Sequence, residues 1–437
     1  MVSRASTSSG TLRPAVRPSG RKCRGLTSYR LASGVSVGQW QGARRPERPS
    51  APIDSTVLFV VVTLVLIGVT LVYATTCHKG IAFLTSQGLR AATGFLVLLL
   101  GAKLRYTLWN GKAKWVVLTV SVAALVLTLV VGFMFKDAQR WMRIGPFTFQ
   151  PAEFAKYGLL VWLAGYFDSL KELGKEHHVL WGFLLPLAVV LGVVGLTLLQ
   201  PAVGTSFIIA FGSLALFVVM GVKWSRLLIT VAVGVALFIL AVTCIPHARD
   251  RLARFRAGRH RQQEQSLIAI GSGGPFGRGL GESRQKFQFL PKMYNDFIFA
   301  EIGEEFGFIG SVAVCLLYLI LFLYGMRISS EARTPFGQNL AAGVSITIFL
   351  YAIVHIAVAL GLIPTTGQPL PFISSGGSAL LSNLSAIGLL LNISRYRRNR
   401  VAVDLPPPSR SSVLRFGPAS APARHKVLVL GRFGGRV

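Results

Sequence analysis

The chain has 437 residues, of which 52% are hydrophobic and only 14% are charged, and its mean hydropathy is +0.56. One soluble core needs far fewer apolar residues, so this composition excludes an ordinary soluble domain. The formal net charge is +30, from 46 Lys and Arg against 16 Asp and Glu.

Much of the positive charge lies at the two ends of the chain. Residues 1–50 contain ten basic residues and one acid, and residues 395–437 contain the same numbers. Both ends are rich in Ser, Pro, Gly and Arg without apolar periodicity, which predicts disordered tails at 1–52 and 395–437 lying on anionic membrane lipids. Nucleic acid is the alternative partner, but no aromatic residues or known module accompany the arginines, so we predict none.

Between the tails, hydrophobic segments predict membrane-spanning helices of about 20 residues each. Eight segments fit: 56–74, 115–135, 179–199, 203–222, 227–245, 302–326, 338–362 and 376–394. Two weaker segments, 91–102 and 151–167, are included because each short loop on one side then carries Lys or Arg, as cytoplasmic loops do. The sequence thus predicts an all-α integral membrane domain of about ten helices at 53–394, with both termini in the cytoplasm.

One long loop, 246–296 between predicted helices 7 and 8, falls on the outer side. It holds ten basic residues and four acids. A cationic outer loop suits an anionic ligand such as a pyrophosphate, but a solvated loop beside lipid headgroups has the same composition. Charge alone leaves both interpretations open.

Four polar or glycine-rich stretches interrupt the hydrophobic pattern, and all four fall on the outer side: 138–156, 200–205, 265–310 and 361–381. Irregular backbone at membrane depth is tolerated only where protein buries it or a wet cavity lies beside it. A lipid-linked substrate needs such a cavity, although helix-capping turns would explain any one stretch alone. Their convergence predicts an external site.

Ionisable residues in or beside the spans are candidates for that site. Glu153 and Lys156 are three residues apart, so they can pair on one helix face; a structural salt bridge and substrate contact are both open. Glu304 and Glu305 are adjacent, so we expect them to face different directions. Asp296 ends the cationic loop directly before an apolar run, where an N-cap is the ordinary role and a partly desolvated catalytic carboxylate is the alternative.

Two motifs, NDFIFAEIGEEFGFIG (295–310) and GLIPTTGQPLPFISSGGSALL (361–381), resemble those of the SEDS family (shape, elongation, division and sporulation), whose members include FtsW, RodA and SpoVE. The likeness covers about 54–400. The stretch GLGESRQKFQFLP (279–291) is more similar to the division branch, FtsW and SpoVE, than to the elongation branch, RodA.

The resemblance implies a ten-helix peptidoglycan glycosyltransferase that polymerises lipid II into β-1,4 glycan strands on the outer face of the bacterial inner membrane, at the septum. It also implies partners: a class B penicillin-binding transpeptidase and other division proteins. The alternatives are a lipid II flippase or transporter, a RodA-like elongation enzyme, and a non-catalytic scaffold.

Carried over by position, the resemblance places an essential acid at Asp296, a loop tryptophan at Trp141 and an intramembrane ion pair at Glu153 and Lys156. Asp296 is then the expected general base, and loop cations hold the pyrophosphate, with or without a divalent cation, Mg²⁺ or Mn²⁺. The candidate substrate-binding residues are Arg140, Trp141, Glu153, Lys156, Gln200, Thr205, Gln265, Ser266, Lys286, Glu304, Pro371, Ser374, Gly376, Gly377 and Ser378.

Three positions depart from the family pattern. Ala202 stands where the family's QPDLGT has an acid, Glu301 where an apolar residue is common, and Ser375 where Tyr is frequent. None of them replaces Asp296.

Overall fold

The computed structural model describes residues 49, 51–76, 81–135, 138–144, 147–244, 261–283 and 296–397. The predictions made for residues 1–48 and 398–437 lie outside this part. The elements in chain order are α1 (Ser55–Thr76), α2 (Ile81–Lys103), η2 (Tyr106–Trp109), α3 (Ala113–Val131), β1 (Phe133–Phe135), β2 (Ala138–Ile144), β3 (Phe147–Phe149), α4 (Pro151–Glu172), η3 (Leu180–Leu184), α5 (Leu185–Leu199), α6 (Val203–Val219), α7 (Trp224–Cys244), α9 (Arg261–Gly273), α11 (Ile298–Glu331), α12 (Pro335–Ala359) and α13 (Gly377–Ser394).

Each predicted span falls on a helix, which confirms the helical membrane fold. Six helical segments are long and apolar enough to cross a bilayer: Ser55–Thr75, Ala113–Val131, Leu180–Leu199, Ile298–Glu331, Pro335–Ala359 and Gly377–Ser394. The helices α6 and α7 provide shorter apolar stretches, while α2 and α4 interrupt theirs with polar residues. The chain is therefore a multi-pass membrane protein, and the number of ten spans stays a prediction.

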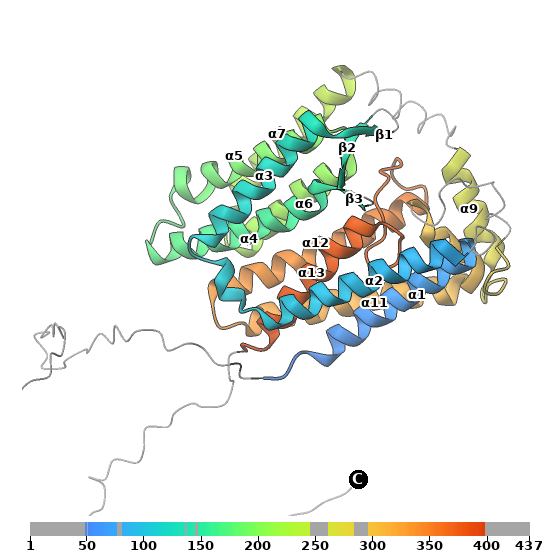
Figure 1. The fold of residues 1–437 in the computed structure, drawn as a ribbon. Coiled ribbons are helices and arrows are strands. Elements are labelled where there is room, and N and C mark those ends of the chain that lie inside the picture. Colours follow the sequence, from blue (N-terminus) through green and yellow to red (C-terminus); the bar gives the residue numbers. More distant parts are fainter. Residues whose placement is uncertain are drawn as a thin grey trace, which may run out of the picture. The chain divides into compact units, whose positions relative to one another are not determined.

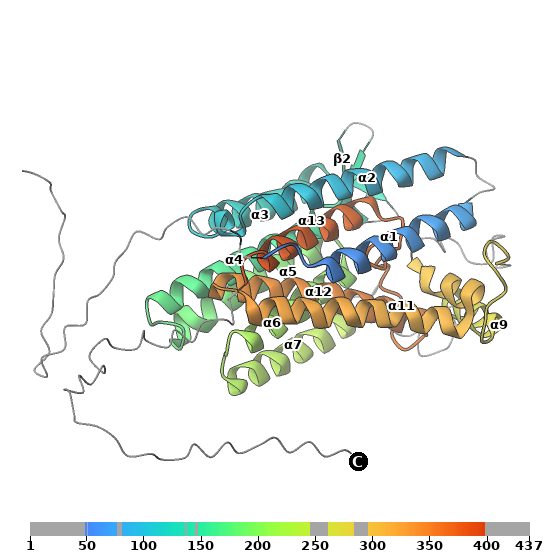
Figure 2. The ribbon, with the colours of Figure 1, turned by 90° about the horizontal axis from the view of Figure 1, so that it is seen from below.

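The helices run roughly along one direction and form a bundle (Figures 1 and 2). Its centre contains α4, α12 and α13; in the apolar stretches, 78% of α13 but only 17% of α3 is buried. Helices that are little buried, such as α3, expose their apolar side chains, as lipid-facing helices do. The charged helix α4 is central because its polar side chains find partners inside the bundle.

Close helix contact in this bundle depends on small residues. In the α2–α13 contact, a Cβ on Gly388 would lie 2.5 Å from the carbonyl oxygen of Leu98. Packing of this kind is the usual source of association between helices in lipid, where the hydrophobic effect contributes little.

A small sheet lies where the sequence predicts the end of a helix. The predicted span 115–135 stops at Val131, and β1, β2 and β3 form an antiparallel sheet in the order β1-β2-β3. The C-cap of α3, Gly132, is extended, and the aromatic residues after it favour strands over helix.

Figure 1 shows the strands, α9 and the segment joining α12 to α13 at one end of the bundle, which we call the motif end. At the opposite end, the residues flanking α1 and α13 meet. The N–H of Ala51 donates to the carbonyl of Arg395 (3.2 Å), and Arg397 forms an ion pair with Asp54, which also caps α1 by accepting from the N–H of Thr56 (3.1 Å).

Candidate functional site

At the motif end, hydrogen bonds join the stretches 138–156 and 200–205 to the stretch 361–381, and they join the stretch 265–310 to α1 and α12. The stretch 265–310 meets 361–381 by apolar packing, since Ile363 packs against the buried cluster that contains Ala269 and Phe297. The contacts between elements are Thr75–Glu301 (α1 to α11), Thr148–Ser378 (β3 to α13), Thr205–Gln368 (α6 to the segment before α13) and Ser266–Ala359 (α9 to α12). The convergence predicted from the sequence is therefore present in the fold.

The Glu153–Lys156 pair lies in the interior of the bundle. Its Nζ and Oε2 atoms are 2.5 Å apart, and the two side chains are only 1–2% exposed. The hydroxyl of Tyr351 lies 2.6 Å from the other carboxylate oxygen of Glu153, and Lys156 Nζ lies 4.1 Å from the ring centroid of Tyr351 and 4.9 Å from that of Tyr157. The predicted pairing is confirmed, and protein groups surround both charges.

The buried pair continues into a polar network that reaches the segment between α12 and α13. Gln368, in that segment, places Oε1 2.7 Å from the Tyr351 hydroxyl, and its amide lies 3.3–3.4 Å from Thr205 Oγ1. His355 Nδ1 is 2.8 Å from the carbonyl oxygen of Gln368. Thr205, a predicted substrate contact, thus binds another part of the chain.

The turn after α9 packs closely on the beginning of α11. A Cβ on Gly273 would lie 1.9 Å from the carbonyl oxygen of Gly303. Within α11, Gly307 has a φ of 68° and breaks the helical path, and a Cβ there would lie 2.3 Å from the N atom of Gly277. The glycines of 265–310 therefore allow two backbones to touch.

The same turn receives both carboxylates of the Glu-Glu pair. Ser283 Oγ donates to Glu304 (2.6 Å), and the N–H of Gly281 donates to Glu305 (3.0 Å). The two neighbouring carboxylates thus have different partners that lie two residues apart in one segment. Glu304, a predicted substrate contact, is 1% exposed.

Asp296 stands at the entrance to α11. It is half-buried and precedes Phe297, which is the N-cap of α11 and makes no side-chain capping bond. The N-cap interpretation of Asp296 is therefore wrong by one residue. The catalytic role of Asp296 stays a prediction. Lys286, a predicted substrate-binding residue, lies outside the described residues.

The strand β2 carries Arg140 and Trp141, both half-buried. Ser378 fixes the sheet against α13, since its Oγ accepts from the N–H of Gln150 (3.1 Å) and donates to the carbonyl of Thr148 (3.3 Å). Ser378 thus positions the tryptophan-bearing sheet.

The segment before α13 is tightly constrained. Phe372 is 2% exposed and has a φ of 68°, which is strained for a residue with a large side chain. The hydroxyl of Ser374 accepts from the N–H of Leu370 (2.8 Å), and the hydroxyl of Tyr318 donates to the carbonyl of Pro371. Such strain persists only where the surroundings hold it, and it is frequent at functional sites.

A cation that the sequence analysis did not select contacts this segment. Arg90 on α2 donates Nη1–H to the carbonyl oxygen of Ser375 (3.2 Å). A Cβ on Gly377 would lie 3.3 Å from Arg90 Cδ, so the absent side chain leaves room for the arginine. Gly376 is the N-cap of α13 and has no side chain with which to cap the helix.

Two further candidate substrate-binding residues, Gln200 and Ser266, form hydrogen bonds with other parts of the chain. Gln200 is buried and donates to the carbonyl of Leu125 (2.9 Å). Ser266 donates to the carbonyl of Ala359 at the end of α12 (2.8 Å). Gln265 on α9 is half-buried, and its substrate contact stays a prediction.

The positions that depart from the family pattern are accommodated in different ways. Ala202 is the N-cap of α6 and makes no side-chain cap. Glu301 is fully buried and accepts a hydrogen bond from Thr75. The carbonyl of Ser375 accepts from Arg90.

Besides Arg90, sequence analysis missed three residues of the polar network: Tyr351, His355 and Gln368. The first two lie four residues apart, on one face of the predicted span 338–362, and a histidine within a span is a signal for function. Gln368 gives no such signal in the sequence, because its place in the polar network depends on partners from other helices.

A metal site finds no support in the part of the chain that the structure describes. None of its His, Cys, Asp and Glu residues form a group of three or more that could hold an ion. The divalent cation therefore stays a prediction.

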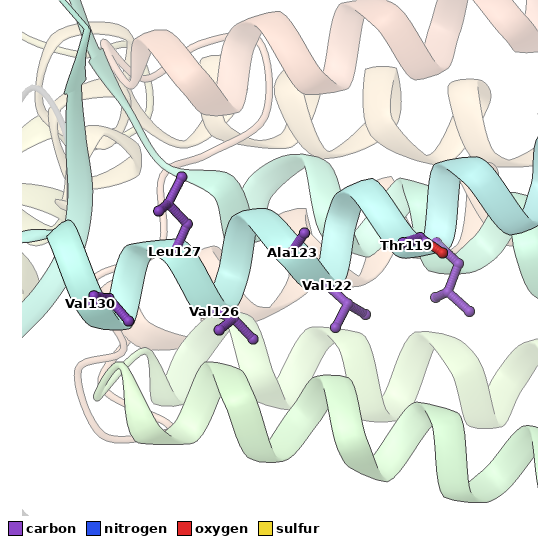
Figure 3. A pocket seen from close by; sticks show the side chains of 7 residues that line it. Thr119, Val122, Ala123, Val126, Leu127 and Val130 are labelled. Atoms are coloured by element: carbon purple, nitrogen blue, oxygen red, sulfur yellow. The ribbon is translucent and has the colours of Figure 1, made fainter.

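A shallow groove of about 570 Å³ runs along α3 from Leu118 to Val130, close to the start of β1. Its lining side chains all come from α3 and are apolar except for Thr119, and Figure 3 shows Val122, Val126 and Val130 on one side of that helix. Exposed valines on a membrane helix are suited to contact with lipid tails.

Comparisons with known proteins agree with the fold. Residues 53–399 match the family FtsW/RodA/SpoVE, described as "Cell cycle protein". The chain is 36% identical over 371 residues to the probable peptidoglycan glycosyltransferase FtsW of Trichlorobacter lovleyi, covering 80% of this chain and 95% of the relative. It is 33% identical to the stage V sporulation protein E of Bacillus subtilis, covering 78% and 97% of the two chains.

Solved structures are similar as well. One belongs to a study of polymerization and crosslinking by a peptidoglycan synthase complex, with a TM-score of 0.68, 27% identity and coverage of 79% of this chain and 99% of the other. The rod shape determining protein RodA of Thermus thermophilus gives a TM-score of 0.61 with 30% identity, covering 79% and 97%.

Proposed function

Because this chain belongs to the FtsW/RodA/SpoVE family of cell cycle proteins, we propose that it is a peptidoglycan glycosyltransferase that polymerises lipid II into β-1,4 glycan strands. Relatives from Trichlorobacter lovleyi and Geobacter sulfurreducens are named probable peptidoglycan glycosyltransferase FtsW, which supports the proposal. We place the reaction on the outer face of the bacterial inner membrane, at the septum, with both tails in the cytoplasm on anionic lipids.

The observation that carries the proposal is the convergence of the four motif stretches at one end of the bundle, with the half-buried Asp296 at the start of α11. In lipid II the sugar is α-linked to pyrophosphate, so a β-linked product requires inversion by in-line attack. The attacking 4-hydroxyl loses its proton to a base as the new bond forms, and the pyrophosphate leaves with the bonding electrons. A carboxylate at the membrane boundary is suited to accept that proton.

The leaving pyrophosphate is a stable anion, so a cation beside it suffices and no general acid is needed. The candidate cations are Arg140, Arg143 and Arg278, which lie among the described residues, and Arg284, Lys286 and Lys292, which do not. A divalent cation is a further proposal on which no step here depends. A class B penicillin-binding transpeptidase is the proposed partner, in keeping with the similarity to a structure from work on a synthase complex.

A flippase is the second candidate function. A transporter needs a binding site near the midplane that opens to both sides. The intramembrane pair Glu153 and Lys156 is buried and its two charges bind each other, so this pair lines no open path. This arrangement favours the enzyme.

The deciding experiment is polymerisation of labelled lipid II by the purified protein with its transpeptidase, comparing wild type with Asp296→Asn. Loss of a positioned base lowers the rate by about 10²- to 10⁴-fold. Glu264→Gln is the matched control, because this carboxylate is exposed on α9 at the same end, and we expect it to retain activity. An active Asp296→Asn protein, or transbilayer movement of lipid II without glycan synthesis, would remove the proposal.

A further inference from the structure

Gln368 anchors the segment between α12 and α13 to the interior. It is 5% exposed, and both its backbone and its side chain have partners on other elements. The carbonyl lies 2.8 Å from His355 Nδ1 on α12, and the amide lies beside Thr205 on α6 and Tyr351 on α12.

The bundle has a site shaped for this side chain. A Cβ on Gly204 would lie 2.6 Å from both Cγ and Nε2 of Gln368. The glycine in the stretch QPAVGT therefore leaves the space that the glutamine occupies.

The protons in this network can be assigned by counting. The Tyr351 hydroxyl has one proton to donate, and both Glu153 Oε1 at 2.6 Å and Gln368 Oε1 at 2.7 Å are within reach, while the Thr205 hydroxyl also contacts it. If the Gln368 amide is turned by half a rotation, its N–H donates to the tyrosine oxygen, and the tyrosine proton goes to the carboxylate. The amide oxygen can then accept from the Thr205 hydroxyl, and the Tyr351–Glu153 and Tyr351–Gln368 contacts have one proton each.

We propose that Tyr351 and Gln368 are positioning residues through which the Glu153–Lys156 pair holds the segment 361–376 in place. The ion pair then acts on the reaction by fixing this segment, which leads to Ser378 and the tryptophan-bearing sheet, and not by touching the substrate. The link to catalysis rests on the proposed function, whereas the link to the segment's position does not.

The chain supplies a matched control in Tyr157. Its ring also lies near Lys156 Nζ, it is buried, and its hydroxyl donates to Asn383 on α13 (2.6 Å). Tyr157→Phe therefore removes a buried hydroxyl beside the same ion pair without touching Gln368.

The first test measures how often the segment 361–376 opens to solvent, in full-length protein without its native cysteines. Thr366→Cys, at a half-buried position in the segment, is labelled with a membrane-impermeant maleimide in the wild-type, Tyr351→Phe and Tyr157→Phe backgrounds. Loss of one hydrogen bond to a carboxylate changes an opening equilibrium by about 10- to 100-fold, so labelling accelerates by that factor in Tyr351→Phe only. Equal rates in the two tyrosine variants, whether raised or unchanged, would overturn the proposal.

A second perturbation reaches Gln368 from the opposite side. Gly204→Ala displaces the glutamine through its Cγ, and we expect the same faster labelling as in Tyr351→Phe. This variant keeps the test decisive if Tyr351→Phe is poorly folded, and slow labelling in well-folded Gly204→Ala protein would contradict the proposal.

The activity test uses Tyr351→Phe, Gln368→Ala and the double variant in lipid II polymerisation. We expect each single variant to lower kcat with little change in KM, and the double variant to be no worse than either single one, because each change breaks the same connection. Independent, multiplying losses would contradict the proposal. If the wild-type protein itself makes no glycan, the proposed function fails, and the labelling test still decides the positioning role.

Discussion

At the scale of single residues, the Glu153–Lys156 pair explains how a charged helix occupies the centre of a membrane bundle. Each charge has a partner at hydrogen-bonding distance, and the Tyr351 hydroxyl supplies a further contact to the carboxylate. Isolated charges in such surroundings are very costly, whereas paired and hydrogen-bonded charges are tolerated.

Removing one charge should therefore be far more harmful than removing both. Lys156→Met leaves the Glu153 carboxylate buried without its cation, and the expected loss in the free energy of unfolding is about 3–5 kcal/mol. The double variant Glu153→Gln/Lys156→Met should recover much of this loss. Denaturation of the detergent-solubilised protein measures both values.

Lys171→Met is the control for this prediction. Lys171 lies on the same helix but is exposed, so its replacement should change stability by no more than about 0.5 kcal/mol. A small effect at Lys156, equal to that at Lys171, would show that the buried pair contributes little.

At the scale of elements, the contact between α9 and α11 organises the motif end. Glycines bring the two backbones together, and the turn after α9 then receives two carboxylates from α11. The entrance of α11, where Asp296 lies, is thus fixed by a helix inside the predicted external loop.

Two glycines on α9 provide a direct test of this contact. Gly273→Ala would place its Cβ 1.9 Å from the carbonyl oxygen of Gly303, whereas a Cβ on Gly271 would meet nothing within 4 Å. We expect Gly273→Ala to separate the helices and to lower both the melting temperature and polymerisation. Gly271→Ala should be neutral, or stabilising by up to about 1 kcal/mol because alanine favours helix.

The outcome that contradicts this account is equal behaviour of the two alanine variants. In that case α9 would shift without consequence, and the close approach at Gly273 would have no role in shaping the site.

At the scale of the whole molecule, the two ends of the helical region meet at the end opposite the motifs. The ion pair Arg397–Asp54 and the backbone bond from Ala51 to Arg395 connect the residues before α1 with those after α13. Arg397 also lies 3.5 Å from Glu331 at the end of α11. Three helices are thus held together where the basic tails begin.

This arrangement predicts the pattern of membrane accessibility. In intact cells, single cysteines at Pro49 and at Arg400 should resist an impermeant maleimide, while one at Glu264 on α9 should react. Labelling after permeabilisation confirms that the first two are reactive. Reaction of Glu264→Cys only after permeabilisation would place the motif end in the cytoplasm and leave the proposed reaction without an external site.

Hydropathy, charge and motif spacing in the sequence determined the membrane class, the helical segments, the family and the Glu153–Lys156 pairing, because these depend on neighbours along the chain. The roles of Thr205, Ser266 and Ser378 depended on partners at Gln368, Ala359 and Thr148. Such contacts join residues tens to hundreds of positions apart, and no local pattern encodes them. The tertiary structure alone therefore decided which polar residues bind other parts of the chain, and it placed Phe297, not Asp296, at the cap of α11.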